Sequence, residues 1–114
     1  PHVVRAMENY KGRLIAYSLG NFATYYGIIV AGIKGIAPIL VTTLDGDGKF
    51  VEGEIISTRQ IRPAGPSIDP EQRALSLIRG LTDEDFDDSG LYFGDDGRFY
   101  PRGVDAWSGA SPQP

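Results

Sequence analysis

The sequence lacks cysteine entirely and contains a single histidine, His2, among its 114 residues. Disulfide bonds and thiolate metal sites are therefore excluded. Any catalytic arrangement that needs an imidazole has only His2 to supply it. A lone histidine can ligate a metal or transfer a proton, but a structural or exposed role is the more frequent one for this residue type.

The chain also lacks a long hydrophobic run and an excess of positive charge. Its longest apolar stretch, Ile28 to Val41, is interrupted by Lys34, two glycines and Pro38, whereas a membrane helix needs roughly 20 uninterrupted apolar residues. The net charge is −4, and no stripe of Lys and Arg is present to neutralise phosphates. We therefore expect no membrane span in this chain and no nucleic acid as its main partner.

The length of 114 residues allows one small domain at most. With 41% apolar residues the chain can bury a core, but a chain of this size buries only about two-thirds of the surface that its unfolded form exposes. Residue 1 is a proline, and no signal-peptide pattern follows it. We expect a fragment or a processed piece of a longer protein.

The first third of the chain predicts a short helix and a strand. Val3, Val4 and Met7 have the spacing of a helix face, which predicts two helical turns over residues 3–8, closed by a turn at 9–12. The apolar run Leu14–Ser18 predicts a buried central strand. Residues 22–35 predict an irregular connection with an edge strand inside it.

Two β-rich runs, Ile36–Leu44 and Phe50–Ile61, predict a long hairpin through an Asp/Gly turn at 45–49. The second run alternates, so its buried face should carry Val51, Ile55 and Ile61 and its exposed face Glu52, Glu54, Thr58 and Gln60. The prolines within 62–66 should then end the sheet. The segment at 45–52 also begins like a calcium loop, but its fifth and sixth positions do not fit one, which favours the turn.

A helix start is marked by Asp69 as N-cap, Pro70 at the first helical position and Gln72 reaching back. Its apolar face should consist of Ala74, Leu77, Ile78 and Leu81. Gly80 predicts a C-cap, and Thr82 predicts a second, one-turn helical start. A shorter hairpin is predicted at 91–93 and 98–100, followed by a disordered tail over residues 101–114.

Two further polar features offer ligand-binding groups. Asn21 follows Gly20 at the end of the predicted strand, where open sheets gather ligands, although the pair also suits a plain tight turn. Five acidic residues between 83 and 88 could attract a cation, but such clusters most often form a solvated helix end. The residues themselves leave both interpretations of Asn21 open.

The N-terminal motifs resemble those of one protein family. Residues 1–8, Pro-His-Val-Val-Arg-Ala-Met-Glu, and residues 10–22, which contain a Lys-Gly turn and close on Tyr-Ser-Leu-Gly-Asn-Phe, are similar to the C-terminal signature of the bacterial capsule-synthesis CapA family. These are poly-γ-glutamate synthesis proteins of the calcineurin-like metallophosphoesterase superfamily. The similarity extends more loosely to about residue 100.

The resemblance implies an α/β (α+β) fold, in which residues 1–100 form the C-terminal part of a four-layer metallophosphoesterase-like β-sandwich flanked by helices, with two β-hairpins. It also implies a divalent metal pair (Mn, Fe or Zn) in the full-length protein, with His2 as one ligand and Asn21 shaping the site. The Asp-x-His and Asn-His motifs that begin such sites have no counterpart here, and one imidazole cannot hold two metals. We therefore expect this chain alone to be inactive and to hold no such pair.

The implied function is that of a metal-dependent phosphoesterase-fold protein in poly-γ-glutamate capsule biosynthesis or export, at the cell envelope or outside the cytoplasm. The implied partners are the missing N-terminal part of the same domain and the capsule-polymer synthesis machinery. Two alternatives stay open, because a fold does not determine a function. One is a non-catalytic envelope assembly or polymer-binding component on the same fold, and the other is an independent β-rich interaction module that shares only the motif.

Overall fold

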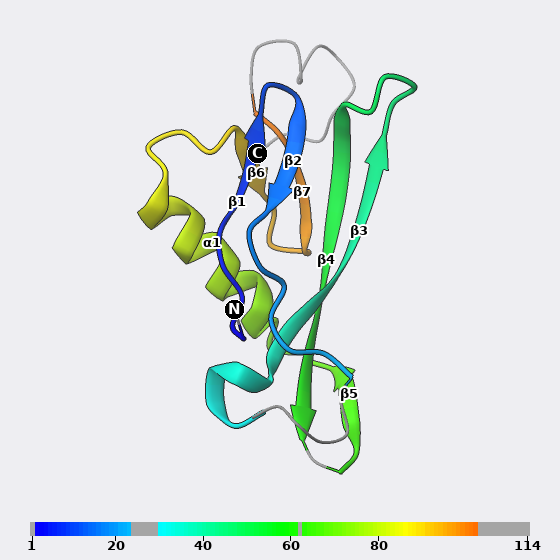
Figure 1. The fold of residues 1–114 in the computed structure, drawn as a ribbon, viewed down its shortest axis with the longest axis vertical. Coiled ribbons are helices and arrows are strands. Elements are labelled where there is room, and N and C mark those ends of the chain that lie inside the picture. The colour runs from blue at the N-terminus through cyan, green and yellow to red at the C-terminus, as the bar shows by residue number, and fades with distance from the viewer. Residues whose placement is uncertain (1, 24–29, 62, 103–114) are drawn as a thin grey trace.

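The computed structural model describes residues 2–23, 30–61 and 63–102, and within these ranges it has an α+β fold with antiparallel strand pairing and one α-helix (Figure 1). In the larger sheet β3, β4, β7 and β6 are neighbours in that order, and β5 also pairs with β4; β1 and β2 form a separate pair. The elements are β1 (Met7–Tyr10), β2 (Arg13–Ala16), a 3-10 turn (Gly32–Gly35), β3 (Ile36–Leu44), β4 (Phe50–Ile61), β5 (Gly65–Ile68), α1 (Arg73–Asp85), β6 (Leu91–Phe93) and β7 (Arg98–Pro101).

The long hairpin is confirmed with the predicted bounds, since β3 and β4 pair from Ile36 opposite Arg59 to Leu44 opposite Phe50. A register irregularity lies between Thr43 and Leu44, next to the turn. The shorter hairpin is confirmed as well: β6 and β7 pair at 91–93 and 99–101. Both hairpins formed where β-favouring runs flank Asp/Gly turns, which are local signals.

The predicted alternation along β4 is only partly correct. Ile55 is buried as expected, but Val51 and Ile61 are exposed, whereas Thr58 and Gln60 are buried. The buried face of β4 changes at Ser57 and Thr58, which are both buried: beyond them Gln60 is buried and Arg59 is exposed. On one face α1 donates its Leu75 backbone N–H to the Ser57 hydroxyl, and on the other residues 21–23 contact Gln60. The alternation rule assumes that the same face stays buried along the whole strand, and here the covering elements change along it.

The prediction that the sheet ends at the prolines of residues 62–66 is wrong. Gly65–Ile68 forms β5, an edge strand that pairs with the end of β4 from Ile61 opposite Gly65 to Thr58 opposite Ile68. Pro66 is accommodated because an edge strand needs its N–H groups for one neighbour only.

The helix forms near the predicted start but begins at Arg73, after a turn at residues 69–72 in which Gln72 is left-handed (φ 51°). Asp69 still serves the helix, because its carboxylate accepts the backbone N–H groups of Glu71 and Arg73, both at 3.1 Å. Gly80 does not end the helix and Thr82 does not begin another one, since α1 continues to Asp85. Its buried residues are Ala74, Leu75, Ile78 and Thr82.

The predicted helix at residues 3–8 is wrong: this segment is extended and ends in β1. Three apolar residues at a helical spacing are too few to exclude a strand. A strand does form in the predicted region Leu14–Ser18, as β2 (Arg13–Ala16), but the prediction that it is buried and central is wrong: within the described residues it pairs with β1 alone and is half-buried. The described part of the connection at 22–35 holds the 3-10 turn and no strand; residues 24–29 and the predicted tail beyond Arg102 lie outside the described residues.

The core lies between α1, the β1–β2 pair and the larger sheet. Phe99 on β7 is fully buried, and its ring stacks on Phe50 at 5.2 Å and on Phe93 at 5.6 Å. The remaining buried members of this cluster are Val4, Met7, Ile55, Leu75, Ile78 and Leu91. Among the described residues, no helix is both long and apolar enough to cross a membrane.

Candidate functional site

The N-terminal segment is one continuous antiparallel ribbon, which we define as residues 2–21, and it places His2 opposite Asn21. The β1–β2 register continues outward through the Arg5 N–H to Ser18 carbonyl bond (3.0 Å) and the bridge between Val4 and Leu19. Two further steps of the same register reach His2 and Asn21. Their side chains meet, with His2 Nδ1 at 2.6 Å from Asn21 Oδ1. The two residues singled out in the sequence are therefore brought together.

The turn of this ribbon explains its Lys-Gly motif. Lys11 and Gly12 both have positive φ, 51° and 82°. Two consecutive left-handed residues form the type of two-residue turn whose twist matches an antiparallel pair. The register that this turn sets is the one that brings His2 to Asn21.

The Ser-Leu-Gly-Asn motif shapes the other end of the ribbon. Ser18 donates its hydroxyl to the Val3 carbonyl at 2.8 Å and accepts the Gly20 N–H at 3.2 Å. Gly20 has φ 76°, and a Cβ there would meet Val4 at 3.3 Å, so a side chain would be both strained and crowded. Serine ties the strands together and glycine allows the bend that leads into Asn21.

Asn21 is buried (6% exposed), whereas the His2 side chain is exposed. The Asn21 side-chain Nδ2 donates to the Lys34 main-chain carbonyl at 3.3 Å, and the Asn21 main-chain carbonyl accepts from Gln60 Nε2 at 2.5 Å. Gln60 also accepts the Ala23 N–H at 2.6 Å. The site thus has a fixed asparagine and an accessible imidazole.

Sequence reasoning missed Gln60 and Lys34 as parts of this site. Gln60 was expected on the exposed face of its strand, but it is 5% exposed and holds the Asn21–Ala23 backbone. Lys34 contributes only its main-chain carbonyl to the site, and because every residue has one, the residue type gives no signal of this role. No local pattern identifies Gln60, because its burial depends on the contact with residues 21–23, and a buried amide then needs hydrogen-bond partners.

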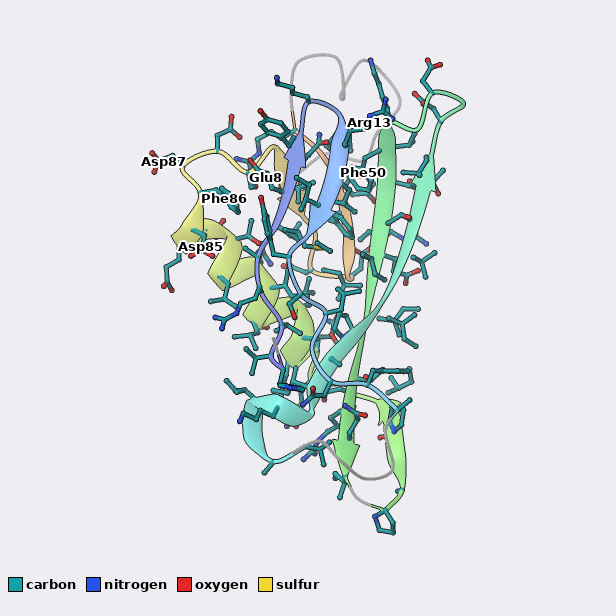
Figure 2. The ribbon with its side chains drawn as sticks, viewed as in Figure 1. Glu8, Arg13, Phe50, Asp85, Phe86 and Asp87 are labelled. Atoms are coloured by element: carbon teal, nitrogen blue, oxygen red, sulfur yellow. The ribbon has the colours of Figure 1, made fainter. Side chains whose placement is uncertain are left out.

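Polar contacts along its length attach the ribbon to the rest of the molecule. The Met7 N–H donates to the buried Thr82 hydroxyl at 3.1 Å, the Asn9 N–H to the Ser89 carbonyl at 2.7 Å, and the Phe50 N–H to the Gly12 carbonyl at 2.8 Å. Figure 2 shows Arg13 beside the β3–β4 turn, where its guanidinium donates to the Asp47 carbonyl. These contacts hold the ribbon, and hence His2, against α1 and the larger sheet.

The Asp/Gly segment at 45–49 is a turn, as predicted. The Asp45 carboxylate accepts the N–H groups of Asp47 (2.8 Å) and Lys49 (3.0 Å). The N–H of Lys49, followed by that of Asp47, holds the pKa of Asp45 below its usual value. Oδ1 of Asp45 therefore accepts the hydrogen bonds that close the turn.

The acidic residues 83–88 follow the solvated interpretation at Asp85 and Asp87, whose side chains point away from the body of the molecule (Figure 2). Asp88 accepts the Gly90 N–H at 2.9 Å and so shapes the next turn. Across all described residues, no group of three or more His, Asp or Glu side chains is placed to hold a metal ion. His2 is thus one candidate ligand rather than a complete site.

A pocket of about 670 Å³ lies between residues 30–36, the end of β4 and the start of α1. Arg59 and Arg73 contribute positive charge to it, but Arg73 is paired with Asp69 (2.9 Å) and Glu71 (2.8 Å). Neither His2 nor Asn21 lines this pocket. The pocket adjoins the imidazole site through Gln60, which lines the pocket and also holds the Asn21 main-chain carbonyl.

The comparisons with known proteins agree with the motif. Residues 1–26 match the family model described as bacterial capsule synthesis protein PGA_cap. A comparison with curated proteins gives no match. The matched segment contains the whole ribbon, from His2 to Asn21. Over residues 1–26 the chain therefore carries the signature of the bacterial capsule synthesis family, and the resemblance deduced from its motifs is confirmed there.

Proposed function

We propose that this chain is the C-terminal part of a CapA-like, metal-dependent phosphoesterase-fold protein that acts in poly-γ-glutamate capsule biosynthesis or export at the cell envelope. His2 is one ligand of a divalent metal pair (Mn, Fe or Zn) in the full-length protein. The other ligands come from residues outside the 114 printed here, because a catalytic metal pair needs more than one imidazole. The α+β unit described above is the closing part of the larger four-layer sandwich.

The observation that carries this proposal is the contact between His2 and Asn21 inside the matched segment. A histidine that ligates a metal generally donates its second ring N–H to a carbonyl or carboxylate oxygen, and Asn21 Oδ1 supplies such an oxygen. Among the described residues the His2 ring makes no other hydrogen bond or ion pair, and His2 is exposed, so its second ring nitrogen is open to a ligand. The donor chemistry at this position fits one ligand of a metal site.

A pair of divalent metals supplies a water of lowered pKa and neutralises the charge that develops on phosphoryl oxygens. This chain's own part is to hold one imidazole at a fixed place. The ribbon does so through its register, and the contacts of Thr82, Ser89 and Phe50 anchor the ribbon to the core.

The test is a comparison of the full-length protein with its His2→Ala variant. Bound Mn²⁺, Fe²⁺ and Zn²⁺ are counted per chain by elemental analysis, and hydrolysis of a chromogenic phosphodiester is measured. We expect metal-dependent hydrolysis in the wild type and a loss of more than about 100-fold in metal affinity in the variant, since even indirect contacts to a ligand are worth about 10–100-fold.

Arg5→Ala is the matched control, because Arg5 lies three residues from His2 on the same ribbon, is exposed, and should leave both readouts unchanged. Equal metal content in wild type and His2→Ala would overturn the role of His2. Metal binding that depends on His2 without any hydrolysis would overturn the phosphoesterase part and favour the non-catalytic assembly role.

A further inference from the structure

The orientation of the Asn21 side chain follows from its contact with Lys34. A backbone carbonyl can only accept a hydrogen bond, so the Asn21 atom at 3.3 Å from the Lys34 oxygen is the NH₂ group. The other end of the amide, Oδ1, must then face His2 at 2.6 Å. The Lys34 carbonyl thus fixes which end of Asn21 the imidazole meets.

The orientation of Asn21 dictates the state of the His2 ring. Oδ1 of an amide only accepts, so His2 Nδ1 must carry the hydrogen that forms this bond. A neutral imidazole carries one ring hydrogen, which leaves Nε2 with a lone pair. A histidine free in water prefers the opposite arrangement, with the hydrogen on Nε2.

The supports of Asn21 make this arrangement rigid. Asn21 is buried, its main-chain carbonyl accepts from Gln60 on β4, and Gln60 is itself 5% exposed and bonded to the Ala23 N–H. On the other side, the ribbon register holds the His2 backbone opposite Asn21. These contacts hold the Asn21 backbone and the His2 backbone in place, and the bond from the Asn21 amide to the Lys34 carbonyl holds the Asn21 side chain.

We propose that Asn21 is the positioning residue of His2: it locks the imidazole in the tautomer with its hydrogen on Nδ1, so that the exposed Nε2 lone pair is the metal-binding atom. The purpose of this lock rests on the proposed function, whereas the tautomer itself is a property of this chain alone. The Lys34 carbonyl also contributes to fixing the tautomer, because it sets the orientation of the Asn21 side-chain amide.

The tautomer is read directly by nuclear magnetic resonance of the full 114-residue chain with ¹⁵N-labelled imidazole, at a pH where the ring is neutral. His2 is the only histidine, so both ring nitrogen signals belong to it. We expect a protonated Nδ1 and an unprotonated Nε2. A hydrogen on Nε2, or the mixture seen for free histidine, would overturn the proposal without any variant.

Two variants test whether Asn21 sets the tautomer of His2. Asn21→Ala should return the ring to the mixture of free histidine, and Asn21→Asp should keep Nδ1 protonated, because a carboxylate still accepts there. Asn9→Ala is the matched control on the same ribbon, and it should leave the ring signals unchanged. An Asn21→Ala ring that keeps the wild-type tautomer while the backbone spectrum stays folded would overturn the role of Asn21.

Zn²⁺ titration of the full-length protein separates this inference from the proposed function. Asn21→Ala should weaken Zn²⁺ binding about 10–100-fold, as for other partners of metal-bound histidines. If the tautomer is as proposed but His2→Ala binds Zn²⁺ normally, the proposed function fails and the tautomer lock stands. If Zn²⁺ binding depends on His2 but not on Asn21, the positioning role fails and the proposed function stands.

Discussion

The molecule contains two hairpins of different character, the ribbon of residues 2–21 and the β3–β4 hairpin. The β3–β4 hairpin has strands of 9 and 12 residues, and one face of its β4 strand carries core residues such as Ile55. The ribbon has strands of only 4 residues and depends on bonds to Thr82, Ser89 and Phe50 from other elements. The β3–β4 hairpin provides the scaffold, and the ribbon carries the family signature and the His2 site.

This difference explains why the two hairpins were predicted so differently. The β3–β4 hairpin is specified by β-branched residues and an Asp/Gly turn, which are visible locally. The ribbon is specified by partners far away in the sequence: Thr82 lies 75 residues beyond Met7, and Ser89 lies farther still from Asn9. A two-residue turn with a lysine at its first position, where Asn or Asp is preferred, gave a weak local signal.

The largest effect is expected from removing the core that both hairpins share. Phe99→Ala deletes a fully buried ring that stacks on Phe50 and Phe93, and it should cost about 3–5 kcal/mol of unfolding free energy. Urea unfolding followed by circular dichroism measures this loss. A loss below about 1 kcal/mol would mean that this aromatic cluster is not the common core.

The second-largest effect is expected to destabilise the ribbon more than the rest of the molecule. Thr82→Val keeps the side-chain shape but leaves the buried Met7 N–H without its acceptor, which should cost about 1–3 kcal/mol. Amide exchange should speed up most in the ribbon.

Thr43→Val, on the exposed part of β3, is the matched control and should be nearly neutral. Equal stability of the two variants would show that the ribbon is not fastened through Thr82.

A smaller, pH-dependent effect on stability is expected at Asp69, which lies between β5 and α1, outside the ribbon. Burial acts to raise the pKa of Asp69, but the N–H groups of Arg73 and Glu71 and the Arg73 charge lower it overall. The stabilisation is therefore present above the ordinary Asp pKa of about 3.9 and is lost as the pH falls through the lowered folded value. Asp69→Asn keeps one oxygen acceptor but loses the charge that Arg73 faces, so it should cost about 1 kcal/mol at neutral pH and should flatten the acid branch of the stability curve.

Chemical denaturation at a series of pH values measures this profile. Asp83→Asn, at an exposed position on the same helix, serves as control. If the stability of wild type and of Asp69→Asn fell equally steeply at acid pH, the ionised Asp69 carboxylate would not be the group that stabilises the fold.

The smallest effect, opposite in sign, concerns the ribbon turn. Lys11 is left-handed, and Asn is preferred in that conformation, so Lys11→Asn should stabilise the chain by about 0.5 kcal/mol. Lys11→Arg keeps both the strain and the cation near the Tyr10 ring and should be neutral. Thermal unfolding of both variants checks this, and a destabilised Lys11→Asn would show that the turn is not of the assumed type.

The sequence allowed part of the site to be predicted. His2 was singled out through the family resemblance, and Asn21 through its place after a strand. Their contact could not be predicted, because residues 3–8 were interpreted as a helix and the register that joins the two residues requires a strand. The roles of the Lys34 carbonyl and of Gln60 depend on tertiary packing, which no local pattern of residues encodes.

The central claim is that the ribbon presents His2 Nε2 as a metal ligand while Nδ1 stays bonded to Asn21. The most direct measurement is the imidazole ¹⁵N spectrum of the full-length protein with and without Zn²⁺, with the His2 signals assigned from the His2→Ala variant. We predict a large change at Nε2 of His2 on adding Zn²⁺, with the hydrogen retained on Nδ1. A His2 ring that is unchanged by Zn²⁺, or one that binds through Nδ1, would contradict the account.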